Sequence, residues 1–175
     1  MAAKGKYFWL NKEAAPLILM EAVKLIDTTE VAGTQSNPTI MKWAEELDLN
    51  KVYNNDDIPW CGLFVGVVVK RTGREIPKNP LWALNWGSWG VPTDVPMLGD
   101  ILVFKRKGGG HVGIYVGEDS YAYHVLGGNQ NNTVNVVRID KRRLLRARRP
   151  PYKNMPQNVR QIFLSPDGKI SDSEA

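Results

Sequence analysis

The order of hydrophobic patterns along the chain most limits the folds that it can adopt. Apolar residues at helical spacing come first, in residues 14–27, 37–49 and 59–72. Short runs of β-branched and aromatic residues then follow, separated by turns rich in Gly and Asn. The expected strands are 101–104, 111–116, 122–127, 133–139 and 144–150. Helices followed by closely spaced strands predict an α+β domain with an antiparallel sheet.

The third helical segment, from about Pro59 to Thr72, is apolar on nearly every side. Asp57 and Pro59 are helix start signals, and Gly73 is a stop signal. The β-branched run at 65–69 also fits a strand. A segment of about thirteen residues is nevertheless long for a strand and ordinary for a helix, so we expect a buried helix.

The length of 175 residues suits one domain with one core. We expect this domain to span residues 14–152, with an N-terminal extension at 1–13 and a polar tail at 153–175 that frays. No apolar run approaches the length of a membrane span, so membrane insertion is not expected. The first residues also lack the pattern of a secretory signal peptide.

The positive charge of the chain is concentrated in one segment. The formal net charge is +5 at pH 7, and residues 141–149 (KRRLLRARR) contain six Lys and Arg residues and no acidic residue. Such a segment can bind an anionic polymer or a membrane surface. It can equally be a solvated strand edge that its charges protect from pairing with other chains.

The single cysteine, Cys61, excludes an intramolecular disulfide bond. It lies in the first turn of the expected third helix, where free backbone N–H groups favour a thiolate and can hold an oxyanion. We therefore expect a partly ionised sulfur. A lone cysteine in an apolar helix is more often simple packing, and the residue pattern alone leaves both interpretations open.

A nucleophilic cysteine needs a base, and the chain offers two histidines. His111 follows the glycines at 108–110 and begins an expected strand, which is typical of an accessible site. His124 lies within an apolar strand, 122–127. His111 is the favoured base.

The imidazole also needs a polar partner that fixes its tautomer. Asn129 is the favoured candidate, because the end of the strand after His111 can return beside the start of the first. Glu118 and Asp119 are weaker candidates, since they belong to the hairpin tip at the opposite end.

Five blocks of the sequence, in this order, resemble a family of phage and bacterial Cys-His peptidoglycan hydrolases related to the NlpC and CHAP groups: NPTIMKW, DDIPWCGLFV, PMLGDILVF, GGGHVGIYVG and VLGGNQNNTV. The resemblance covers roughly residues 30–150. It implies a papain-like α+β fold in which the nucleophile begins a helix that packs on an antiparallel sheet. It also implies that Cys61 is the nucleophile, His111 the base and Asn129 the third polar residue, with no cofactor and no metal.

Substrate contacts are expected from residues near the cysteine and from an aromatic stripe. Tyr53, Asn54 and Asn55 lie just upstream of Cys61 and are candidates for a second oxyanion donor. Trp82, Trp86 and Trp89 have helical spacing and could line a groove, although core packing is the favoured explanation. The predicted substrate-binding residues are Tyr53, Asn55, Trp60, Trp86 and Gly110.

The resemblance implies cleavage of an amide or peptide bond of the bacterial cell wall through a Cys61 thioester, by an N-acetylmuramoyl-L-alanine amidase or an endopeptidase. We expect a monomer with peptidoglycan as its substrate and no obligatory nucleic acid. We also expect an endolysin, made in the bacterial host cytoplasm and released through a holin, with a virion-associated lysin or an exported effector as alternatives. The alternative functions are an anionic-polymer binding module and a papain-like transferase or deamidase acting on protein.

Overall fold

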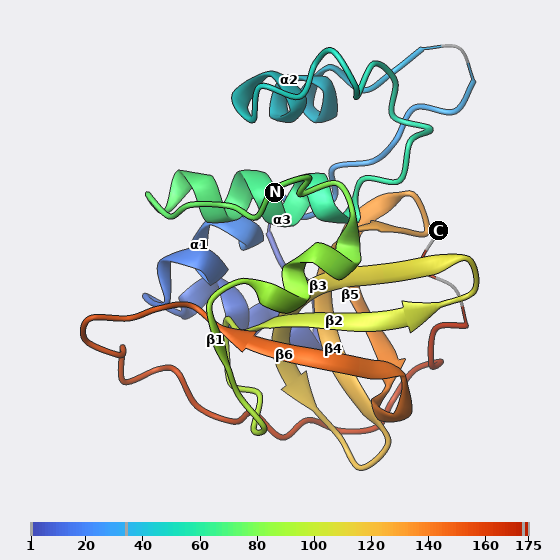
Figure 1. Cartoon of the computed structure of the whole chain (residues 1–175). Coiled ribbons are helices and arrows are strands. Elements are labelled where there is room, and N and C mark those ends of the chain that lie inside the picture. The colour runs from blue at the N-terminus through green and yellow to red at the C-terminus, as the bar shows by residue number, and fades with distance from the viewer. Residues whose placement is uncertain (1, 34, 173, 175) are drawn as a thin grey trace.

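The computed structural model describes residues 2–33, 35–172 and 174, and it has the predicted α+β architecture (Figure 1). The helices are α1 (Leu17–Val23), α2 (Pro38–Glu46) and α3 (Cys61–Arg71), with the 3-10 helices η1 (Gly5–Lys12), η2 (Ala83–Ser88) and η3 (Lys141–Arg143). The strands are β1 (Val91–Pro92), β2 (Ile101–Arg106), β3 (Gly109–Glu118), β4 (Ala122–Gln130), β5 (Thr133–Asp140) and β6 (Leu144–Arg149).

The strands form one sheet in the order β1-β6-β2-β3-β4-β5, and every neighbouring pair is antiparallel. Tight turns join β2 to β3 and β4 to β5. Asn131 and Asn132, between β4 and β5, both have positive φ (52° and 60°), which suits a two-residue hairpin turn. These hairpins bring the starts of β3 and β5 beside the ends of β2 and β4.

The three α-helices lie on one side of the sheet, with α3 next to it and α2 farther out (Figure 1). Helix α3 contacts β3 and β4, and its residues 61–69 are all buried. The prediction of a buried helix rather than a strand is therefore confirmed. Gly62 lies against the backbone carbonyls of Pro80 and Leu81, and a Cβ atom at this position would collide with the Pro80 oxygen. The second residue of α3 must therefore be glycine.

Both faces of the sheet are apolar. Ile101, Val103 and Val112 belong to the larger core shared with the helices, whereas Leu102 and Phe104 belong to a second, smaller cluster. Because alternate residues of β2 are buried on opposite sides, this strand has a continuous apolar run in the sequence.

The structure differs from the sequence prediction at both ends of the chain. Helix α1 is shorter than the predicted 14–27: Pro16 is its N-cap, and residues 24–27 form turns. The N-terminal extension contains η1, whose Leu10 is buried. The tail does not fray throughout, since Phe163 pairs with Glu118 and Ile170 with Arg138 through parallel bridges. Backbone hydrogen bonding outweighs the polar composition of these segments.

Among the helices of the described residues, none combines the length and the apolar character that crossing a membrane requires.

Candidate active site

Cys61 is the first residue of α3, and its sulfur lies against β3. The backbone N–H groups of Val112, Gly62 and Cys61 itself face the sulfur and favour its ionised form. Val112 directly follows His111, so the cysteine reaches the part of β3 that carries the favoured histidine. The side chain is buried, with only 4% of its surface exposed, yet it lines an open cleft.

The imidazole of His111 is held by Gln130. His111 Nε2 and Gln130 Oε1 are 3.0 Å apart. The Gln130 amide nitrogen donates to the carbonyl oxygens of Val125 (3.2 Å) and Asn135 (2.7 Å), which fixes the amide with its oxygen toward the imidazole. An amide oxygen only accepts, so Nε2 carries the proton and Nδ1 keeps its lone pair. His111 is thus fixed in the tautomer that can accept a proton at Nδ1.

The structure gives His111 a different partner from the predicted Asn129. Asn129 has a positive φ of 55°, and its buried Oδ1 has no hydrogen-bond partner among the described residues. The pairing of β4 with β5 shifts register between Gly127 and Gln130, which marks a bulge. At this bulge Gln130 Oε1 turns toward His111, and the absence of a side chain at Gly127 leaves room for both groups. The hydrogen-bond partner of His111 is thus one residue after the predicted Asn129, and a catalytic role for either residue stays a prediction.

Burial keeps the cysteine and histidine uncharged at neutral pH. Burial raises the pKa of the Cys61 thiol, and the N–H groups of Val112 and Gly62 lower it less than burial raises it. Burial also lowers the pKa of His111 to about 4, although Glu174 and Gln130 act in the opposite direction. A neutral thiol therefore takes the place of the expected partly ionised sulfur, because desolvation outweighs the effect of the helix N-terminus.

A cleft with a volume of about 720 Å³ opens beside Cys61. One wall is formed by Ile58 and Pro59, which precede α3, and a second wall by residues 81–83 at the start of η2. The third wall comes from the end of β2, the β2–β3 turn and the start of β3, with Arg106 and residues 108–110. Three separate segments therefore enclose a space next to the sulfur.

Most of the predicted substrate-binding residues do not line this cleft. Tyr53, Trp60 and Trp86 are fully buried, and the indole N–H groups of the two tryptophans donate to Glu30 and to the Pro80 carbonyl. Asn55 is half-buried and its side chain accepts from the Asp57 N–H within its own loop. Core packing and loop hydrogen bonds therefore account for these side chains. Gly110 does line the cleft.

Two cleft residues are absent from the predicted substrate-binding residues: Arg106, and Trp82, which was considered only as part of the aromatic stripe. Trp82 has 58% of its surface exposed, whereas Trp86 and Trp89 are buried and stack at 5.8 Å between ring centroids. Tryptophan spacing alone does not reveal which ring faces outward. For Arg106 the available signal was its position just before the glycine-rich turn at 108–110, where small residues leave space for a ligand.

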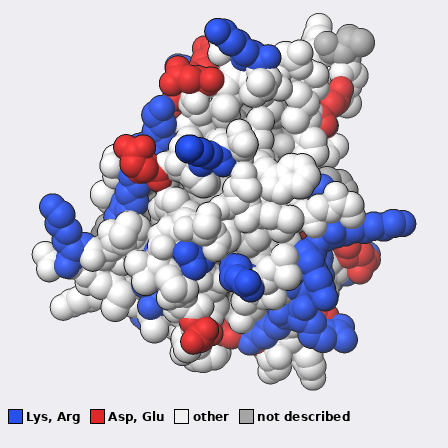
Figure 2. Space-filling model, viewed as in Figure 1, with Lys and Arg blue, Asp and Glu red and all other residues white. Residues whose placement is uncertain are grey.

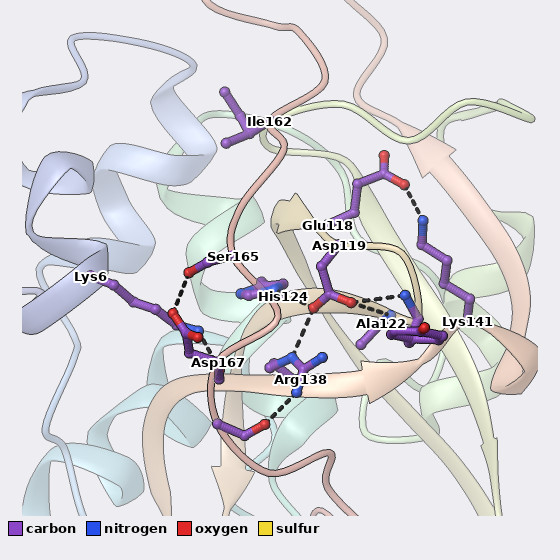
Figure 3. Close-up of polar contacts among 12 residues, drawn as sticks. Lys6, Glu118, Asp119, Ala122, His124, Arg138, Lys141, Ile162, Ser165 and Asp167 are labelled. Atoms are coloured by element: carbon purple, nitrogen blue, oxygen red, sulfur yellow. Dashed lines mark hydrogen bonds and ion pairs between the residues drawn. The ribbon is translucent and has the colours of Figure 1, made fainter.

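The other histidine, His124, belongs to a buried polar network away from the cysteine. His124, Asp119 and Arg138 come from β4, the β3–β4 turn and β5, and point toward one another (Figure 3). Asp119 Oδ2 accepts from His124 Nε2 (2.9 Å) and from Arg138 Nε (2.8 Å). His124 Nδ1 accepts from the Tyr7 hydroxyl at 2.7 Å. Both ring nitrogens are occupied, so this histidine ties strands to the N-terminal segment.

Lys and Arg side chains gather over the end of β2 and the start of β6 (Figure 2). Within the predicted basic segment most charges are neutralised. Four cations of this segment form ion pairs with acidic residues: Lys141–Glu118, Arg142–Asp140, Arg143–Glu174 and Arg149–Asp100. Arg148 donates to the carbonyl oxygens of Trp89 and Gly90. The segment is thus bound into the fold by its charges, which weakens the case for a polymer-binding module.

No group of three or more His, Cys, Asp or Glu side chains among residues 2–33, 35–172 and 174 is arranged to hold a metal ion.

Comparison with known proteins identifies the family. No individual curated protein matches the chain. Residues 55–149, more than half of the sequence, match the NlpC/P60 family, and they include Cys61, His111 and Gln130. This family consists of cysteine peptidases that hydrolyse peptidoglycan. The chain therefore belongs to the NlpC/P60 family.

Proposed function

We propose that the protein cleaves an amide bond of peptidoglycan with Cys61 as nucleophile, His111 as base and Gln130 as the residue that orients His111. The observation that carries this proposal is the fixed tautomer of His111: Gln130 accepts its Nε2 proton, and His111 directly precedes Val112, whose backbone N–H faces the Cys61 sulfur. Nδ1 is then free to accept the thiol proton. The cleft beside Cys61 provides space for a peptide.

The reaction starts from the neutral pair. As the substrate carbonyl arrives, His111 Nδ1 takes the proton from the Cys61 thiol, and the sulfur attacks the carbonyl carbon. The backbone N–H of Cys61, in the first turn of α3, is our candidate donor to the oxyanion. His111 then gives its proton to the leaving amine, which leaves a thioester on Cys61. Water attacks the thioester with His111 as base, releasing the acid and restoring the thiol.

Clearing of a peptidoglycan suspension tests the nucleophile. We expect the Cys61→Ala and Cys61→Ser variants to lose activity by at least about 10³-fold, because without the thiolate no thioester forms. Thermal melting of each variant serves as the control for folding. Equal clearing by folded Cys61→Ala and wild type would contradict the proposal.

Mass spectrometry of the released fragments distinguishes an amidase from an endopeptidase. An amidase leaves the muramic acid lactyl group as a free acid, whereas an endopeptidase exposes a new amine within the peptide. A transferase or deamidase would instead modify protein substrates. We favour the hydrolase because of the family, which consists of peptidoglycan hydrolases.

We further propose an endolysin role, with synthesis in a bacterial cytoplasm and release through a holin. The similarity of the five sequence blocks to phage and bacterial hydrolases supports it. The test is expression in a bacterial host with and without a co-expressed holin, followed by culture turbidity. We expect rapid lysis when both are present and none when Cys61→Ala replaces the wild type. Lysis without a holin, or none with one, would contradict this role.

A further inference from the structure

The cleft beside Cys61 contains a cation that has no anionic partner among the described residues. Arg106, the last residue of β2, lines the cleft and is half-buried. Its Nε atom is buried and has no hydrogen-bond partner among the described residues. Neighbouring Arg143, by contrast, is held by Glu174 through two hydrogen bonds of 2.7 and 2.6 Å. A buried guanidinium nitrogen without a partner is costly, so a bound group that accepts hydrogen bonds is expected to stabilise it.

The surroundings of Arg106 leave room for such a group. The residues that line the cleft include no Asp or Glu, so no described side chain of the cleft neutralises this charge. Gly108 lies in the β2–β3 turn and Gly109 begins β3, and a Cβ atom at either position would meet nothing within 4 Å. The open space therefore lies next to the cation. The exposed indole of Trp82 lines the same cleft and offers an apolar surface.

We infer that Arg106 binds a free carboxylate of the peptidoglycan stem peptide and makes the enzyme selective for stems in which that carboxylate is not amidated. This inference rests on the proposed function and names its substrate class. A guanidinium presents paired N–H donors in a plane that matches a carboxylate, and it donates less well to a neutral carboxamide, which lacks the negative charge. Stem peptides of peptidoglycan carry carboxylates on the glutamate and the diamino acid.

Matched substrates test this selectivity. One pair of muropeptides carries D-glutamate or D-isoglutamine, and the second carries the diamino acid with its carboxylate free or amidated. We expect wild-type kcat/KM to fall about 10- to 100-fold on amidation in at least one pair, the range of a charge-assisted hydrogen bond. The Arg106→Gln variant should cleave both members of each pair at similar rates. Arg106→Lys should keep part of the preference, because the charge remains without the paired donors.

The ratio of kcat/KM between the two muropeptides of a pair separates carboxylate binding by Arg106 from its general electrostatic effect on the reaction. Besides burial, which dominates both shifts, the guanidinium lowers the pKa of the Cys61 thiol and of His111, so its removal changes the reaction rate for every substrate. That change is common to both members of a pair and cancels in the ratio. Lys107→Gln is the matched control, since Lys107 is an exposed neighbouring cation that does not line the cleft. It should leave the preference unchanged.

Binding to the Cys61→Ala variant keeps this inference separate from catalysis. Calorimetric titration of Cys61→Ala with the same muropeptides should show tighter binding of the carboxylate form, and Cys61→Ala/Arg106→Gln should lose that difference. Selective binding without any hydrolysis by the wild type would overturn the proposed function and leave the carboxylate site standing. Equal affinity for both members of both pairs, or a preference that survives Arg106→Gln, would overturn the carboxylate site.

Discussion

The chemistry of His111 and Cys61 depends on how far each side chain is removed from water. The His111 side chain is almost fully buried and has a neutral amide as its direct partner, so the charged imidazolium is poorly solvated. The thiolate is disfavoured for the same reason. In the proposed mechanism, the thiolate–imidazolium pair of Cys61 and His111 therefore forms only when substrate is present.

The pKa of His111 predicts a pH dependence of stability. The pKa is about 4 in the folded protein and has an ordinary value of 6.5, so the unfolded chain binds the proton more tightly. The stabilisation by neutral His111 is complete above pH 6.5 and is lost as the pH falls toward 4. We expect wild type to lose about 2 to 3 kcal/mol more than His111→Gln between pH 7 and pH 4, measured by urea unfolding. Parallel pH curves for the two proteins would contradict this shift.

At the scale of elements, the bulge in β4 decides which side chain reaches the His111 imidazole. A regular strand would place residues 129 and 130 on opposite faces. The shift of register after Gly127 and the positive φ of Asn129 change this alternation, and Gln130 becomes the partner of His111. The orientation of the imidazole is thus a property of the strand as well as of Gln130.

Paired substitutions at the bulge test this assignment. Gln130→Ala should lower kcat on the order of 10²-fold, because His111 loses the acceptor that fixes its tautomer. Asn129→Gly keeps the positive φ and should retain most of the activity. Activity on purified peptidoglycan measures both effects, and thermal melting shows whether each variant folds. A larger loss for Asn129→Gly than for Gln130→Ala would assign the role to Asn129 instead.

At the scale of the whole molecule, the sequence predicts the architecture better than it predicts the site. The order of helices and strands follows from periodicity, and the antiparallel sheet and the buried α3 are confirmed. The outward orientation of Trp82 and the inward orientation of Trp86 depend on packing across the molecule. The choice of Gln130 over Asn129 depends on a bulge that local spacing does not encode.

The tail and the N-terminal segment also make contacts that their local sequence does not predict. Their composition is polar, yet Tyr7 binds His124, and Glu174 pairs with Arg143 while acting on the pKa of His111. The two contacts join residues that are 117 and 31 positions apart along the chain. Long-range ion pairs and hydrogen bonds therefore place both ends of the described chain against the catalytic domain.

The burial of the Cys61 sulfur has a consequence for its chemical durability. Peroxides attack the thiolate far more readily than the thiol, and they need access to the sulfur. A side chain that is 4% exposed and has a raised pKa presents neither the reactive form nor much surface while the cleft is empty. An enzyme waiting for substrate under oxidising conditions therefore keeps its sulfur reduced and remains ready for its first turnover.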